Sequence, residues 1–152
     1  MPYQLAQINI ARARGPLDGE RMRGFMEALD EINALAERSP GFVWRFKTEA
    51  GNATSVRAFA DPRLLVNVSV WESVDALRAY VYRSRHGRFF ARRGEWFEKM
   101  DTAHLALWWI PGGALPTLEE AKARLDMVAE RGDSPEAFTF AQIYSPAGER
   151  IA

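Results

Sequence analysis

Apolar and polar residues alternate in several short stretches of the chain, which is the pattern of strands with one face turned towards a core. The clearest stretch is YQLAQINIA (3–11), where Leu5 and Gln7 fall on one face and Ile8 and Ile10 on the other. Four other stretches are rich in the β-branched and aromatic residues that favour strands. They are FVWRFK (42–47), LLVNVSVW (64–71), HLALWWIP (104–111) and AFTFAQIY (137–144).

Between these stretches, apolar residues recur every three or four positions, as they do on one face of a helix. The first predicted helix starts near Asp18, a good N-cap residue, and ends at SPG (39–41). The second starts near Ser73 and continues, after a kink, through RHGRFFARRGEWFEKM (85–100). The third covers TLEEAKARLDMVAERG (117–132), which opens with the spacing of a capping box.

The predicted elements follow the order β-α-β-β-α-β, and then α-β. This is the ferredoxin-like order of an α+β fold with a C-terminal α-β extension. No repeat or linker divides the sequence, so we expect a single domain over residues 1–152. In this topology the strands 3–11 and 64–71 are neighbours at the centre of the sheet.

The two central strands carry polar residues that this topology can place on one surface. The residues concerned are Gln7, Asn9, Asn67, Ser69 and Trp71. Because unpaired buried amides are costly, such a strip needs a reason. Either a wet ligand cavity lies over it, or a second subunit closes this face of the sheet.

Composition excludes several classes of function. The chain has 20 basic and 20 acidic residues, so no overall field attracts nucleic acid or a membrane surface. It contains no cysteine, which removes thiol nucleophiles and agrees with a reducing, cytoplasmic location. No stretch approaches the roughly 20 apolar residues of a membrane helix. His86 and His104 have no paired carboxylates near them, so we predict no metal site.

The stretch 85–100 is the main candidate for chemistry. On a helical wheel of about 100° per residue, one face combines aromatic residues with a histidine and an arginine. That face carries His86, Phe89, Phe90, Arg93, Trp96, Phe97 and Met100. In one interpretation it is packing material, with Arg93 at its edge and His86 solvated or capping the helix. In the other it lines a cavity, where His86 is a ligand or acid/base and Arg93 an anion clamp.

Several sequence motifs, taken together with this predicted topology, resemble those of known protein families. The run VSVWES followed by ALRAY resembles the antibiotic-biosynthesis and haem-degrading monooxygenase families, which are dimeric α+β barrel proteins. Five further motifs spread over nearly the whole chain resemble an uncharacterised bacterial family of that superfamily. These motifs are QLAQINIARARGPLD, INALAERSPGFVWR, LVNVSVWES, YRSRHGRFF and LALWWIPGG. The resemblance implies a homodimer in which one sheet face of each subunit is buried against the other.

The resemblance also implies roles for single residues. In the haem-degrading relatives a helix His ligates the haem iron, while a strand Asn and a Trp shape the pocket. The matching positions here are His86, Asn9 and Trp71. In the cofactor-independent relatives, an activated phenolic substrate reacts with oxygen in the same type of pocket. The resemblance therefore implies either no cofactor or haem.

Together these observations favour a small monooxygenase-like oxidoreductase acting on an aromatic or polyketide-type molecule, or on haem. His86, Asn9 and Arg93 are the predicted catalytic residues. The predicted pocket walls are Asn67, Trp71, Phe89, Phe90, Trp96 and Phe97. Two alternatives stay open: a non-catalytic module that binds a hydrophobic small molecule, and a redox-neutral isomerase or cyclase on the same scaffold.

Overall fold

A computed structural model describes residues 3–46, 63–85, 92–100 and 102–152. Its strands are β1 (Tyr3–Ala13), β2 (Phe42–Arg45), β3 (Leu64–Trp71), β4 (Phe97–Glu98) and β5 (Leu105–Pro111). Its helices are α1 (Arg23–Glu37), α2 (Val74–Arg85), α4 (Arg93–Trp96) and α5 (Leu118–Arg131). A single 3₁₀ turn, Glu20–Met22, leads into α1. The order of the long elements confirms the ferredoxin-like α+β fold.

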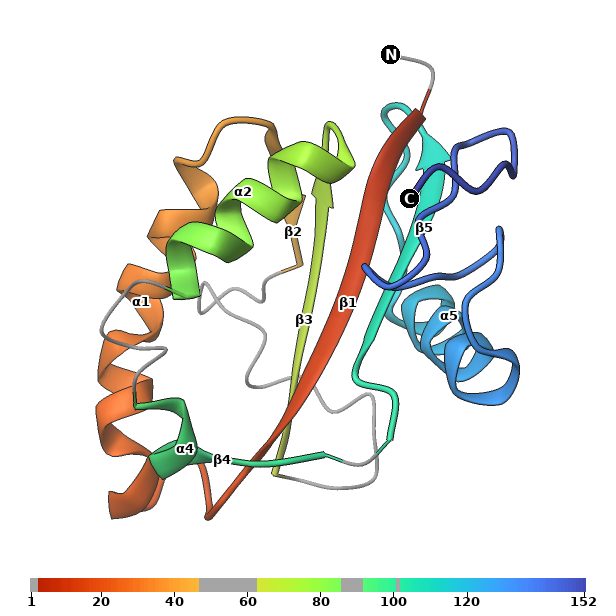
Figure 1. Cartoon of the computed structure of the whole chain (residues 1–152). Helices are drawn as coiled ribbons and strands as arrows, with labels where there is room; N and C mark the ends of the chain where they lie inside the picture. The colour runs from red at the N-terminus through yellow and green to blue at the C-terminus, as the bar shows by residue number, and fades with distance from the viewer. Residues whose placement is uncertain (1–2, 47–62, 86–91, 101) are drawn as a thin grey trace.

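The sheet is antiparallel and has β1 at its centre (Figure 1). One edge of β1 pairs with β3, and β2 follows beyond β3. The other edge pairs first with β5 and then, at its end, with the short β4. The prediction that the strands 3–11 and 64–71 are neighbours in the sheet is therefore confirmed. Gln7 lies opposite Ser69, and Asn9 lies opposite Asn67.

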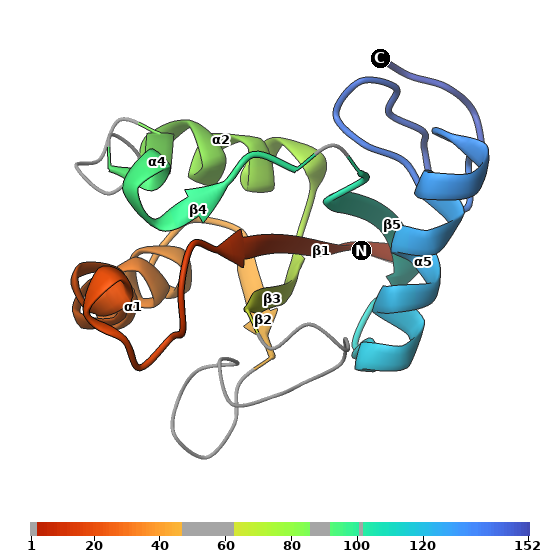
Figure 2. The same cartoon turned by 90° about the horizontal axis from the view of Figure 1, so that it is seen from below.

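The two faces of the sheet are covered by different helices. The helices α1 and α2 lie over one face, and α5 lies on the far side of the β1–β5 pair (Figure 2). On the α5 face, Ala121 and Leu125 of the helix join an apolar cluster with Ile8, Val68 and Trp108 of the strands. The helix α5 thus packs on the sheet face opposite the one that carries the polar residues of the two central strands. The homodimer itself stays a prediction.

In the described residues 92–100 the predicted helix does not continue to residue 100, so the prediction of one continuous amphipathic stripe is wrong there. The helix α2 ends at Arg85, α4 has only four residues, and the backbone becomes extended at Phe97. Phe97 and Glu98 then pair with Ala13 and Arg12 at the end of β1. Pairing with β1 gives the backbone N–H and C=O groups of Phe97 and Glu98 hydrogen-bond partners, as a helix would also do. These two residues therefore form a strand although the apolar spacing of the sequence is helical.

Two strand predictions also need correction. A bulge between Phe42 and Trp44 breaks the alternation expected over 42–47. As a result Phe42 contacts Trp71 on the helix face, whereas Trp44 joins the cluster on the α5 face. The stretch 137–144 forms only isolated bridges, among them Leu107 with Phe138.

The reason for the missing last strand is local hydrogen bonding. The Asp133 carboxylate accepts a bond of 2.6 Å from the Thr139 backbone N–H, and the Ser134 N–H donates to the Ala137 carbonyl. Turns therefore use the backbone groups that a strand would present to a neighbour. The aromatic residues of this segment still pack, since Phe138 is buried against Leu107.

The predicted helix ends are confirmed in one case and wrong in the other. The Thr117 hydroxyl accepts from the Glu120 N–H at 3.1 Å and caps α5 as expected. Asp18 does not cap α1, because the 3₁₀ turn Glu20–Met22 intervenes, and the N-cap residue of that turn is Gly19, without a side-chain cap.

Candidate functional site

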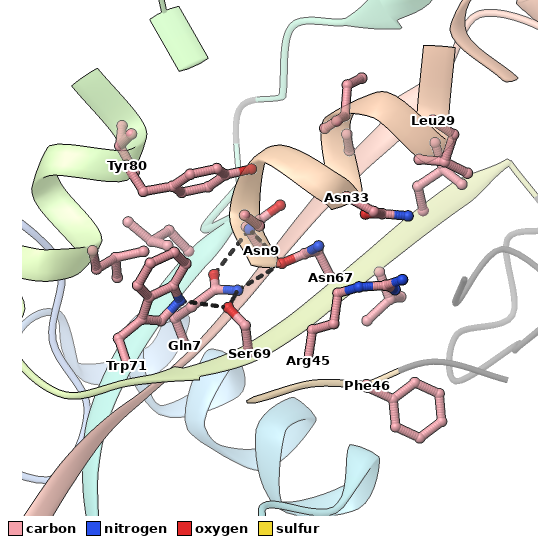
Figure 3. A pocket seen from close by; sticks show the side chains of 18 of the residues that line it. Gln7, Asn9, Leu29, Asn33, Arg45, Phe46, Asn67, Ser69, Trp71 and Tyr80 are labelled. Carbon is pink, nitrogen blue, oxygen red and sulfur yellow. Dashed lines mark hydrogen bonds between the residues drawn. The ribbon is translucent and has the colours of Figure 1, made fainter. Parts of the chain in front are cut away.

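A cavity of about 340 Å³ lies between the sheet and the helices α1 and α2 (Figure 3). This volume is at the lower end of the range for small-molecule pockets. Strand residues form its polar floor, and apolar side chains of α1 and α2, among them Leu29, Ile32 and Leu77, form its walls. Phe140, from the segment after α5, also lines it.

The polar floor is a connected hydrogen-bond network, which we call the polar cluster: Gln7, Asn9, Asn67 and Ser69. The Gln7 amide nitrogen donates to the Asn67 carbonyl oxygen and to the Ser69 hydroxyl, each at 2.7 Å. The Asn9 amide nitrogen donates to the Gln7 carbonyl oxygen at 2.9 Å and makes a longer contact of 3.4 Å with Asn67 Oδ1. The Trp71 indole N–H donates to the same Ser69 hydroxyl at 2.9 Å.

This network fixes which way the Asn67 amide points. Its oxygen is the acceptor for Gln7, so its NH₂ group is turned away from Gln7. Among the described residues no acceptor meets that NH₂ group, and Asn67 lines the cavity. Asn9 is bound tightly through one N–H only, because 3.4 Å is long for a hydrogen bond. The polar cluster therefore offers a ligand the Asn67 NH₂ group as a donor, together with the Asn9 side-chain carbonyl oxygen as an acceptor.

Aromatic rings form one end of the cavity. Tyr80 of α2 stacks on Trp71 with ring centroids 5.1 Å apart and an interplanar angle of 27°. Phe42 meets the Trp71 ring edge-on, which holds it in place. Burial raises the pKa of the Tyr80 hydroxyl above its usual 10.0, so it is a neutral donor near pH 7. No described residue hydrogen-bonds that hydroxyl, which Figure 3 shows directed over the cavity.

The opposite end of the cavity is lined by Asn33 of α1 and Arg45 of β2. Arg45 lies beside Ser69 across the β2–β3 pair, and its Nε–H donates to Glu37 Oε2 at 2.8 Å. Its side chain is only 10% exposed. Asn33 is buried, and in the described part of the chain its amide has no hydrogen-bond partner.

The structure brings together some of the predicted site residues and separates others. Asn9, Asn67, Trp71 and Phe97 all line the cavity. The prediction was wrong for Trp96 as a pocket wall: it is buried in a separate cluster around Met22, because α4 ends where β4 begins and turns its ring away.

The other predicted residues are outside the cavity or outside the described residues. Arg93 is exposed at the start of α4 and does not line the cavity. His86, Phe89 and Phe90 lie outside the described residues, so their predicted roles stay predictions.

The sequence analysis missed three polar residues of the pocket: Asn33, Arg45 and Tyr80. For Asn33 a signal existed, because it is a polar residue between Ile32 and Ala36 on the apolar side of a helix. Arg45 had none, since the bulge that aims it at the cavity does not appear in the alternation pattern.

The described lining residues do not fit haem. Haem iron is normally held by His, Cys, Met or a tyrosinate. The described part of the lining contains none of the first three, and the raised pKa of Tyr80 disfavours its phenolate. Nor do the described residues group three or more metal-ligating side chains anywhere.

Comparison with known proteins identifies the family. A family model described as Domain of unknown function (DUF3291) matches residues 4–152. The chain belongs to this family. This confirms the resemblance to an uncharacterised family, whereas no curated protein matches the sequence. Among the helices of the described residues, none is long and apolar enough to cross a membrane.

Several solved structures are similar in shape to this DUF3291 protein. SnoaB, a cofactor-independent oxygenase from Streptomyces nogalater, is 18% identical; the match covers 79% of this chain and 100% of SnoaB, with a TM-score of 0.43. NE2512, a protein of unknown function from Nitrosomonas europaea, is 11% identical over 76% of this chain and 94% of its own, with a TM-score of 0.46. PA3566 from Pseudomonas aeruginosa is 13% identical over 75% and 98%, with a TM-score of 0.43.

Proposed function

We propose that this protein binds a planar phenolic molecule in the cavity and, as a small monooxygenase, promotes its oxidation by O₂. The observation that carries the proposal is the Asn67 amide, which the polar cluster holds with its NH₂ group free for a ligand. A phenolic oxygen that accepts from this amide would place its ring beside the Trp71–Tyr80 pair. Trp71 and Phe97 then act as apolar walls, as the sequence suggested.

A donor-rich site suits such chemistry because O₂ reacts with the electron-rich phenolate, not with the neutral phenol. Asn67 and Tyr80, with the second N–H of Asn9, would stabilise the phenolate oxygen. Fixed donors in a site that excludes water are worth roughly 3 kcal/mol each towards a developing oxyanion. We assign the role of proton acceptor to His86, as the sequence predicted. Arg93 has no role in this proposal, since its side chain is outside the cavity.

The overall reaction balances with O₂ as the only co-reactant. With 1-naphthol as probe, the phenol loses its O–H and one ring C–H, and that ring carbon gains a carbonyl oxygen. The O–O bond breaks, one oxygen atom enters the product 1,4-naphthoquinone, and the other leaves as water. The phenol loses four electrons and O₂ gains four. Because O₂ is the oxidant, the proposal needs no haem.

A second candidate is the non-catalytic binding module. It is favoured by the described lining, which offers donors and apolar surface but, within those residues, no carboxylate and no histidine that could act as a base. The redox-neutral isomerase or cyclase is the third, and it consumes no oxygen.

An oxygen electrode distinguishes these candidates. The protein is incubated with 1-naphthol, and oxygen uptake and quinone absorbance are followed together with binding by calorimetry. The monooxygenase proposal predicts saturable binding and one quinone per O₂, with turnover lowered at least tenfold in Asn67→Leu and His86→Ala. Binding without oxygen uptake would overturn the monooxygenase and support the binding module. Failure of 1-naphthol to bind would contradict both.

A further inference from the structure

We infer that Asn33 forms a second polar subsite of the cavity, which selects phenols that carry a second hydroxyl group. The inference rests on the proposed function, because it adds a second anchor to the same phenolic ligand. Trp71 and Tyr80 stand at one end of the cavity, and Asn33 of α1 stands at the other (Figure 3). A ligand that reaches from one end to the other therefore meets polar groups at two separate places.

The Asn33 side chain is buried without a hydrogen-bond partner in the described part of the chain. The residue is only 8% exposed, yet no hydrogen bond between described residues involves its amide. A buried amide with unsatisfied donors and acceptor costs free energy, and native proteins almost always provide a partner. The neighbouring lining residues on this side of α1 are apolar: Leu29, Ile32 and Ala36. A leucine would suit the position better, so the amide needs another reason to be there.

The Asn33 amide is accessible from the cavity. Asn33 lines the cavity, and Figure 3 shows its side chain reaching from α1 into the space above the strands. Among the described residues, Glu98 Oε2 is the only fully enclosed side-chain polar atom that lacks a hydrogen bond. The polar atoms of Asn33 also lack one, so they are not fully enclosed. A ligand in the cavity can therefore reach them.

An amide with both ends unpartnered is complementary to a hydroxyl group. Its NH₂ group donates and its carbonyl oxygen accepts, and a hydroxyl does both through one oxygen atom. A keto or ether oxygen only accepts, and a carboxylate brings a charge that a neutral amide does not compensate. Arg45 lies at the same end of the cavity, but it donates to Glu37 at 2.8 Å and makes a further interaction. The subsite is therefore Asn33 alone, and the ligand class is a planar dihydroxy-aromatic molecule.

The test uses pairs of probes that differ only in a hydroxyl or a methyl group on the second ring. The hydroxyl probes are 1,5-, 1,6- and 1,7-dihydroxynaphthalene, and their counterparts are 5-, 6- and 7-methyl-1-naphthol. A methyl group fills nearly the same volume but forms no hydrogen bond. In calorimetric titrations of the wild-type protein, we expect at least one diol to bind about fivefold or more tightly than its methyl counterpart.

Asn33→Leu should reverse this preference, because the diol would then bury a hydroxyl group without a partner. The methyl probe should bind this variant more tightly than the diol, while the affinity for 1-naphthol stays within about twofold. Leu29→Ala is the matched control, since Leu29 lines the cavity one helical turn before Asn33. It removes apolar wall and should weaken diol and methyl probe alike, so that their ratio is unchanged.

Urea denaturation separates a binding role of Asn33 from a structural one. Asn33→Leu removes an unsatisfied buried polar group, so this variant should unfold at a higher urea concentration than the wild type. Unfolding at a lower concentration would mean that the amide has a structural partner, and it would overturn the subsite.

The binding outcomes separate the subsite from the proposed function. If every diol bound the wild type no better than its methyl counterpart, the subsite would be overturned while 1-naphthol binding still supported the cavity. A preference for the diol that survives Asn33→Leu would overturn it as well. If neither 1-naphthol nor any of the other probes binds, the proposed function fails with it.

Discussion

Ser69 is the residue on which the polar floor of the cavity depends. Its hydroxyl accepts from two buried donors, the Gln7 amide and the Trp71 indole. Ser69→Ala leaves both without this acceptor, and we expect the free energy of unfolding to fall by about 1–3 kcal/mol. Urea denaturation measures the change. In a Trp71→Phe background the same substitution should cost less, because one donor is already gone; equal costs in both backgrounds would contradict the shared bond.

Tyr80 makes the stability depend on pH in the alkaline range. Burial raises its pKa above 10.0, so the unfolded chain loses this proton at a lower pH than the folded one. The folded state then holds more protons, and its stability falls as pH rises above about 10. Tyr80→Phe lacks this contribution. Urea denaturation at about pH 8 and about pH 11 should show a larger loss for wild type than for the variant. Equal losses would mean that the Tyr80 hydroxyl titrates normally.

At the residue scale, the sequence correctly predicted the positions of residues that follow the two-residue alternation of a regular strand. The alternation of two neighbouring strands is enough to place Gln7, Asn9, Asn67 and Ser69 on one surface, and the structure does so. It was not enough for Arg45, because a bulge shifts the face of every later residue in β2. For Asn33 the amphipathic pattern gave a signal, a polar residue on the apolar side of the helix, but it does not tell whether that side chain lines a cavity.

At the scale of elements, the turn between α1 and β2 fixes how α2 approaches the sheet. Gly41 has φ of 83°, and its carbonyl accepts from the Glu72 N–H at 2.8 Å. A Cβ at this position would collide with the Cβ of Ala76 in α2. The turn and the helix touch so closely that only glycine fits between them.

Gly41→Ala should therefore destabilise the protein through both strain and collision. Gly113 is a matched control, with φ of 89° and no described heavy atom within 4 Å of its added Cβ. We expect about 1–2 kcal/mol for Gly113→Ala from the left-handed backbone alone. Gly41→Ala should cost clearly more in the same urea denaturation assay. If both variants lost the same stability, the close packing of α2 on this turn would be refuted.

The prediction differs most from the structure in residues 92–100, which were expected to be part of one helix. A helical wheel assumes one continuous helix, and each break in the helix resets the faces. Trp96 and Phe97 share one face of the wheel, yet with the strand pairing at Phe97 only Phe97 lines the cavity. This long-range pairing depends on where β1 ends, and the sequence around Phe97 gives no information about that.

On the scale of the whole molecule, α5 packs on the sheet face that points away from α1 and α2. An exposed apolar face would have required a partner, but Ile8, Val68 and Trp108 are already buried within the single chain. A homodimer, which we still predict, would therefore use another surface. Light scattering tests it: the prediction is twice the chain mass of 17.2 kDa, and a single chain mass over a wide concentration range would refute it.

The account as a whole depends on whether the cavity takes a phenolic ligand. The most direct measurement is a calorimetric titration of 1-naphthol into three proteins: wild type, Ala11→Trp and Ala147→Trp. Ala11 lines the cavity on β1, so a Trp there should fill it, whereas Ala147 is exposed and serves as the matched control. We predict saturable binding near one ligand per chain in wild type and Ala147→Trp, and its loss in Ala11→Trp. Absence of binding to wild type, or equal binding to all three proteins, would contradict the account.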